Sequence, residues 1–221
     1  MQQTAETDAP LGDAADEQTL VAIYDLGRAP PTYDFLSFLA HAETDRVRRG
    51  RRKLALVLQP GPNHGFRQDS LPPDIASRCW MRDRIVIPAA GLVNASWTTE
   101  PDAARRARSY PYLLRGVVDG VRAGDAAPVF APSALARATV ERWRAGRRLI
   151  VFTLREAAYW PARNSRLDQW RAVIEPLLLD DRYTPVVVRD TANALASFGR
   201  VPTLPAASFD LDIRAALYEA A

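Results

Sequence analysis

Four runs of apolar, mostly β-branched residues stand out along the chain and predict β-strands, at 20–25, 53–58, 149–154 and 185–189. Uninterrupted apolar runs of this length are typical of strands that are covered on both faces, as in parallel sheets. Segments with a helical spacing of apolar residues separate the first run from the second and the third from the fourth. The pattern therefore predicts two β-α-β units, each with parallel strands and a right-handed crossover.

Three side chains in this pattern are good helix N-caps. We expect Thr32 to cap the helix after the first strand and Ser133 to cap a helix that leads into the third. Ser165 is expected to cap a helix over 166–179, which connects the third strand to the fourth.

The stretch between the two units is harder to assign. Residues 74–92 are apolar enough to be buried, but Pro88 argues against an unbroken helix and 85–87 could equally form a strand. After a short helix over 101–108 we expect a turn and then a polar linker that contains Gly116, Gly120 and Gly124.

These elements together predict an α/β protein with two Rossmann-like halves. The halves are expected over 20–128 and 129–221, with the boundary falling within 125–132. Residues 1–19 contain five acidic residues and no Lys or Arg, and they are expected to form a disordered acidic tail.

The composition, with 48% hydrophobic and 25% charged residues, is that of an ordinary globular protein. The formal net charge is +3, and Lys53 is the only lysine among 29 basic residues, which indicates a GC-rich genome rather than a selected nucleic-acid surface. Arginine clusters beside Gly50 and Gly146 are explained by helix C-termini, where cations offset the helix dipole. We therefore expect no nucleic-acid partner, whereas an anionic small molecule suits the charge.

Several classes of chemistry are not expected. Cys79 is the only cysteine and there are two histidines, which argues against a disulfide, a zinc site or a His-rich metal centre. No glycine-rich phosphate loop is present, so neither a nicotinamide cofactor nor ATP hydrolysis is expected, and we predict no cofactor. A secretory leader pattern and an apolar run of roughly 20 residues are also lacking, which predicts a cytoplasmic protein that is not transmembrane.

Polar residues follow the third strand abruptly and are the first candidates for a binding site. Arg155 and Glu156 end the strand, and the loop after it contains Arg163 and Asn164. Ligands of open α/β sheets bind at the carboxyl ends of the strands, and a guanidinium suits a phosphate or carboxylate. In the alternative, the two arginines form structural ion pairs with nearby carboxylates, namely Glu156, Asp168 or Asp190.

The ends of the other strands carry further candidates. Asp34 could act as a general base toward a sugar hydroxyl, or it could simply interact with the helix dipole. His64 could act as a base or a phosphate donor, or it could be a solvated loop residue. Asp190 could bind a ribose or diphosphate, or it could cap a helix. The rings of Tyr159 and Trp160 could stack on a ligand or pack over the sheet.

Three segments, 25–35, 65–69 and 153–165, resemble bacterial proteins of the GT-B glycosyltransferase type that are found with surface-polysaccharide biosynthesis. The strand-end pair of Leu154 and Arg155 is also distantly similar to the His-x-Arg-Arg motif of fucosyltransferases, in which an arginine holds the nucleotide-sugar phosphates. Glu156 stands where that motif has its second arginine, so the similarity covers Arg155 alone.

The resemblance implies a GT-B-like fold that transfers a sugar from a nucleotide sugar to a glycan or lipid-linked acceptor, in a cleft between the two halves. It implies catalytic roles for Asp34 and His64 and donor-site roles for Arg155, Arg163, Asn164 and Asp190. Donor domains of this type continue with further strands after a segment like 212–219, so the second half is expected to be incomplete and the chain inactive alone unless a partner chain completes it. The alternative is a non-catalytic α/β subunit that binds a sugar or nucleotide.

Overall fold

The computed structural model describes residues 18–69, 73–105 and 107–221. The chain divides into two compact units, one that ends at Val129 and one that runs from Phe130 to Ala221. Most of the expected acidic tail lies outside the described residues, but Thr19, which we assigned to that tail, is the first residue of a strand and pairs with Lys53.

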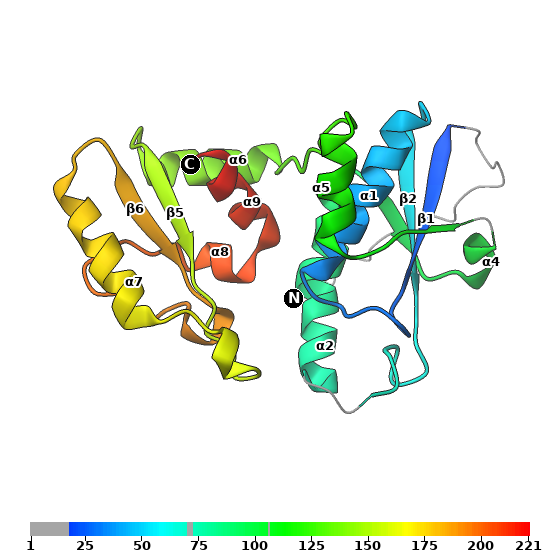
Figure 1. Ribbon diagram of the computed structural model, residues 1–221, viewed down its shortest axis with the longest axis horizontal. Coiled ribbons are helices and arrows are strands. Elements are labelled where there is room, and N and C mark those ends of the chain that lie inside the picture. Colours follow the sequence, from blue (N-terminus) through cyan, green and yellow to red (C-terminus); the bar gives the residue numbers. More distant parts are fainter. Residues whose placement is uncertain (1–17, 70–72, 106) are drawn as a thin grey trace, which may run out of the picture. The chain divides into compact units, whose positions relative to one another are not determined.

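The first unit is built on a four-stranded sheet in the order β3-β2-β1-β4, with every neighbouring pair parallel (Figure 1). Its strands are β1 (Thr19–Asp25), β2 (Lys53–Gln59), β3 (Ser96–Thr98) and β4 (Arg108–Ser109). The parallel pairing of β1 with β2 confirms the first predicted β-α-β unit. The two outer strands are only three and two residues long, too short for a hydrophobic pattern to reveal them.

Helix α1 (Asp34–Arg48) connects β1 to β2 and buries an aromatic face against the sheet. Phe35 and Phe38 are fully buried, and their rings lie 4.8 and 4.9 Å from that of Tyr24 on β1. The prediction that Thr32 is the N-cap residue of this helix is wrong, since Tyr33 holds that position and makes no side-chain capping bond. The Thr32 hydroxyl, one residue earlier, still contacts the first turn: it accepts a bond of 3.4 Å from the Asp34 N–H and donates to the Asp34 carboxylate at 2.8 Å.

The segment that could not be assigned is helical throughout. It consists of α2 (Ile75–Met81), a π-helix (Arg82–Val86) and α3 (Ile87–Gly91), so the alternative of a strand over 85–87 is wrong. Pro88 lies just after the π-helix, whose wider turn accommodates the proline ring and its missing N–H.

The glycine-containing stretch expected to be a linker is a helix, α5 (Leu114–Arg122), while the short helix before it, α4, covers only Pro101–Ala104. Glycine lowers intrinsic helix propensity, which is why the sequence pattern indicated a loop. Gly116 lets α5 lie close to α1, and Gly120 leaves room for the Asp125 side chain, since a Cβ there would lie 2.7 Å from Asp125 Oδ2. A Cβ atom on Gly116 would lie 2.5 Å from Cε1 of His41 on α1.

The second unit contains a two-stranded parallel sheet of β5 (Leu149–Thr153) and β6 (Thr184–Val188), as the second β-α-β pattern predicted. Two hydrophobic clusters cover its two faces. One includes Leu149 and Val186 with residues of α6 (Ala134–Arg144), α8 (Ala206–Phe209) and α9 (Leu211–Glu219). The other includes Val187 and residues of α7 (Leu167–Ile174).

Of the two expected N-caps in this unit, one is confirmed and one is wrong. The Ser133 hydroxyl accepts a hydrogen bond from the Ala136 N–H at 3.1 Å and caps α6. The Ser165 hydroxyl instead accepts from the Arg155 N–H at 3.0 Å, and Arg166 is the N-cap of α7 without a side-chain bond. The expected helix over 166–179 ends as α at Ile174 and continues as a 3₁₀-helix (Glu175–Leu179), since proline at position 176 removes a helical N–H.

Both units are therefore α/β with parallel sheets, which is compatible with two Rossmann-like halves. None of the helices in the described part of the chain is long and apolar enough to cross a membrane.

Candidate functional site

Arg155, at the carboxyl end of β5, is fixed by the loop that follows it. Its Nη1 donates to the Trp160 carbonyl at 3.1 Å and to Asn164 Oδ1, and its Nη2 donates to the Tyr159 carbonyl at 2.9 Å. The guanidinium also lies over the Tyr159 ring, 5.3 Å from its centroid. A guanidinium has five N–H groups, so two remain that make no hydrogen bond to any described residue.

The alternative in which Arg155 and Arg163 form structural ion pairs is wrong. Neither arginine takes part in an ion pair with any described residue. Arg163 is exposed and lies 5.6 Å from the centroid of the Trp160 ring. Trp160 is half exposed and has a left-handed backbone with φ of 54°, a conformation that costs energy for a large side chain and that the bond from Arg155 helps to hold.

The carboxylate next to Arg155 belongs to a different, buried network that the sequence analysis missed. Glu156 forms a bidentate pair with Arg189 on the end of β6, with distances of 2.8 and 2.5 Å. Asn193 donates a further bond of 3.1 Å to the same carboxylate. The hydrogen bond to Glu156 raises the pKa of Arg189 above its ordinary value. The network neutralises Glu156 and leaves Arg155 without a competing carboxylate.

Asn164 and Asp190 are both engaged in holding the strand-end loops together. Asn164 accepts from Arg155 and donates from Nδ2 to the Ala157 carbonyl at 2.9 Å. Asp190 accepts from the Glu156 N–H at 2.5 Å; it holds the N-cap position of the 3₁₀-helix (Thr191–Asn193), as its alternative role proposed, but its side chain makes no capping bond. The structure thus brings Arg155 and Asn164 into direct contact, whereas Asp190 reaches this group through Glu156.

The strand ends of the first unit carry the two residues proposed as catalytic. Asp34 is exposed at the first position of α1, the position that suits its alternative role at the helix dipole. His64 is exposed at the tip of a tight turn with φ of 50°, in which Gly61 bridges to Gly65. No hydrogen bond joins the two residues, and His64 receives none from the described part of the chain.

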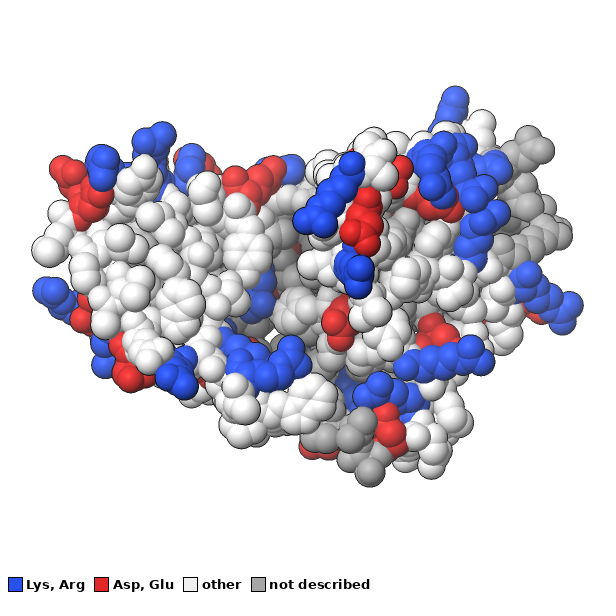
Figure 2. Space-filling model, viewed as in Figure 1, with Lys and Arg blue, Asp and Glu red and all other residues white. Residues whose placement is uncertain are grey.

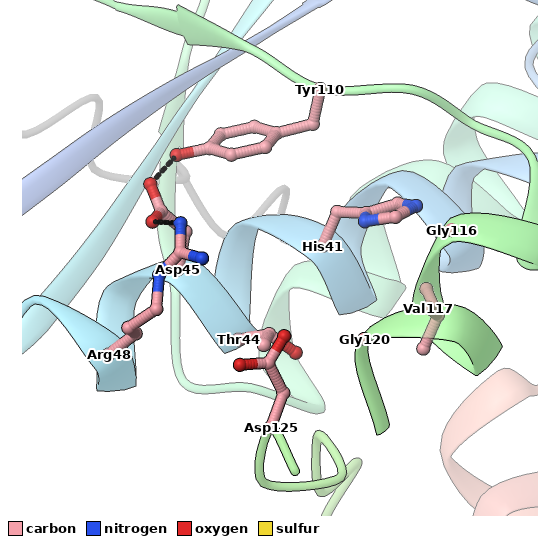
Figure 3. A pocket seen from close by; sticks show the side chains of 9 residues that line it. All are labelled: His41, Thr44, Asp45, Arg48, Tyr110, Gly116, Val117, Gly120 and Asp125. Atoms are coloured by element: carbon pink, nitrogen blue, oxygen red, sulfur yellow. Dashed lines mark hydrogen bonds and ion pairs between the residues drawn. The ribbon is translucent and has the colours of Figure 1, made fainter. Parts of the chain in front are cut away.

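A small polar cavity of about 120 Å³ lies between α1 and α5 in the first unit, and the sequence analysis did not anticipate it (Figure 3). Figure 3 shows His41, Asp45 and Arg48 projecting from α1, with Tyr110 on one side and Asp125 near the end of α5. The sequence did contain a signal for this cavity, because the polar residues His41, Asp45 and Arg48 recur every three to four positions on one face of α1.

Asp45 is the electrostatic centre of this cavity. Tyr110 donates to Asp45 Oδ2 at 2.7 Å, and Arg48 and Arg49 each donate to the carboxylate at 2.7 Å. Burial alone would raise the pKa of Asp45, but the bonds from Arg49, Tyr110 and Arg48 outweigh it and lower the pKa to about 2. Burial and the bond to Asp45 raise the pKa of Tyr110 above its ordinary value.

His41 closes the other end of the cavity. Its Nε2 lies 3.3 Å from the Leu113 carbonyl, which accepts a hydrogen bond when Nε2 is protonated and leaves Nδ1 as an acceptor. The cavity therefore combines an imidazole, a threonine hydroxyl and carboxylates with two arginine side chains nearby. It can hold water or a small hydroxylated molecule, whereas the Asp45 carboxylate is already neutralised.

Comparison with known proteins adds no family assignment, because no family model, curated protein or solved structure matches the chain. Among the described residues, no group of three or more His, Cys, Asp or Glu side chains could hold a metal ion.

Proposed function

We propose that this protein binds a nucleotide sugar at the carboxyl end of β5 and acts as a glycosyltransferase-like protein toward a glycan or lipid-linked acceptor. The observation that carries the proposal is the state of Arg155. Its guanidinium is oriented by three hydrogen bonds to its own loop, has no carboxylate partner among the described residues, and keeps two N–H groups that bond to none of them. An arginine prepared in this way favours a planar, bidentate contact with a phosphate.

The surroundings of Arg155 support the same ligand. Arg163 adds a second positive charge on the same loop, and its contact with the Trp160 ring holds it there. Tyr159 and Trp160 lie edge to face with their centroids 6.5 Å apart, and the exposed indole offers a surface on which a base or sugar could stack. Charge, aromatic surface and strand-end position are what a diphosphate-linked ligand requires.

A second candidate function is binding without catalysis, which the state of the proposed catalytic residues favours. The Asp34 carboxylate already accepts a hydrogen bond from Thr32 and lies at a helix N-terminus, so it is engaged within its own turn. His64 has no orienting partner among the described residues. A general base normally needs such orientation, so transfer would depend on an acceptor that supplies it.

The test is a thermal-shift and calorimetric screen against GDP-, UDP-, ADP- and CMP-sugars. Loss of a charge-assisted contact is worth about 1.5–3 kcal/mol, so Arg155→Ala should weaken binding by about one to two decades. Arg155→Lys should recover only part of the affinity, because a point charge cannot form the fork. Arg142→Ala, an exposed arginine on α6, is the matched control and should bind like the parent protein.

Binding that is equal in Arg155→Ala, Arg155→Lys and the parent would overturn the proposal. Release of the nucleoside diphosphate in the presence of an acceptor, abolished by Asp34→Asn or His64→Ala, would identify a transferase. Tight binding without any release would identify the non-catalytic alternative.

A further inference from the structure

The two outer edges of the two-stranded sheet in the second unit differ in whether another described segment pairs with them. The outer edge of β6 is covered, since the Val187 N–H donates to the Pro202 carbonyl at 2.9 Å and Val187 bridges to Thr203. The outer edge of β5 pairs with no described strand. Natural proteins normally protect such an edge with charge, proline or a bulge, and β5, with the sequence Leu-Ile-Val-Phe-Thr, contains none of these.

The backbone groups that this edge presents can be assigned from the ladder to β6. The Thr184 N–H donates to the Arg148 carbonyl at 2.7 Å and the Leu154 N–H donates to the Val188 carbonyl at 2.9 Å, so residues 148 and 154 face β6. Backbone direction alternates along a strand, which turns the N–H and C=O groups of Leu149, Val151 and Thr153 away from β6. Leu149 is only 5% exposed, whereas Val151 and Thr153 are more accessible. No described residue forms a hydrogen bond with these groups.

Apolar side chains flank the open edge on both faces of the sheet. On one face the Trp170 ring of α7 lies 5.9 Å from that of Phe152, and Val173 follows one turn later with 59% of its surface exposed. On the other face the Tyr218 hydroxyl of α9 lies 2.7 Å from the Thr153 hydroxyl, and Tyr218 is 46% exposed. Figure 2 shows that the face of this unit that carries β5 and α7 is nearly free of charged side chains, which gather along its margins.

We propose that this edge is a self-association surface, on which the β5 strand of a second copy pairs antiparallel about a two-fold axis through Val151. The three outward-facing residues are spaced symmetrically about Val151, so a second β5 offers the same donors and acceptors in register. A two-fold interface brings the same patch of both copies together, so the apolar flanks of the edge meet each other. The cations that bracket the strand have partners in their own unit: Arg147 and Arg155 donate to carbonyls, and Arg148, directly before Leu149, lies 6.0 Å from the centroid of the Tyr183 ring.

Pairing in this way would join two marginal sheets into one of four strands. Isolated two-stranded sheets are seldom stable without added strands or packing, and the second copy would add its strands at the open edge. The α7 helices of the two copies would then extend one helical layer, with Trp170 and Val173 of each near the junction. This proposal does not depend on nucleotide-sugar binding.

The test measures the mass of the full chain by sedimentation over a hundredfold range of concentration, together with amide exchange at Leu149, Val151 and Thr153. We expect a concentration-dependent dimer in which these amides are protected only when the dimer forms. Val151→Pro removes an outward N–H and spares the bonds to β6, so it should raise the dimer dissociation constant at least tenfold. Val173→Arg should do the same through a charge on the flank, whereas Leu195→Arg, at another exposed site of the unit, should not.

Three results would overturn the proposal. These are a monomer at every concentration, a dimer that Val151→Pro and Val173→Arg both leave intact, or protection of the three amides in the dilute monomer. If Val151→Pro fails to fold, Val173→Arg and the exchange measurement on the parent chain decide the question.

Discussion

Glu156 and Arg189 form a buried bidentate ion pair that ties the end of β5 to the end of β6, with side chains only 7% and 9% exposed. The pair holds the two strand ends together immediately beside Arg155. It is a structural element of the second unit, although both residues lie where a ligand site is expected.

Loss of one partner of this pair should be strongly destabilising, because the remaining charge would be buried without compensation. We expect Arg189→Met to lower the free energy of unfolding by about 3–5 kcal/mol, measured by urea denaturation. The double variant Glu156→Gln/Arg189→Met should recover part of the loss. Arg182→Ala removes an exposed pair with Asp180 and should leave the free energy of unfolding nearly unchanged. Equal losses in the two arginine variants would contradict the assignment.

Asp45 should make the first unit sensitive to acid. Its folded pKa of about 2 lies below its ordinary value of 3.8, so its contribution to stability is present above pH 3.8 and is lost as the pH falls through the folded pKa. The shift corresponds to about 2 kcal/mol. Tyr110→Phe removes one stabilising bond, so the folded pKa should rise and the acid-dependent loss should shrink. Carboxyl-carbon NMR of Asp45 measures this directly, with Tyr112→Phe as the control.

Gly116 should be intolerant of a side chain even though it lies in a helix. A Cβ atom there would approach Cε1 of His41 to 2.5 Å, so Gly116→Ala must displace the imidazole and its contact with the Leu113 carbonyl. We expect a loss of about 1–3 kcal/mol and a change in the His41 NMR signals. Gly91→Ala is the matched control, because nothing lies within 4 Å of a Cβ at that helical position, and it should stabilise by up to about 1 kcal/mol. A neutral effect of Gly116→Ala would show that α5 moves away readily.

The two serines that sequence pattern treats alike should behave differently. Ser133→Ala removes the N-cap of α6 and should cost about 1 kcal/mol of stability. Ser165→Ala removes no cap from α7. It removes the acceptor of the Arg155 N–H, so amide exchange at Arg155 should accelerate while helix content stays constant. A loss of helix content in Ser165→Ala would contradict the hydrogen-bond assignment.

How far sequence alone predicts this protein can be seen at particular elements. The apolar runs predicted β1, β2, β5 and β6 and their parallel pairing, because strands covered on both faces leave a continuous hydrophobic signal. Strands β3 and β4, of three and two residues, leave no such signal and are defined only by their pairing with β2 and β1. Helix α5 was missed because its glycines lower local propensity, whereas the close approach to α1 that Gly116 permits is a tertiary effect.

The candidate site divides in the same way. The sequence by itself determined that Arg155, Glu156 and Asp190 would lie at strand ends and Asn164 in the loop after β5, since position along a strand follows from pattern. Only the tertiary structure decided that Glu156 would pair with Arg189, 33 residues away, and that Arg155 would form its hydrogen bonds within the loop that follows it. Hydrogen-bond partners depend on distances and directions between segments remote in the chain, and local spacing carries no information about them.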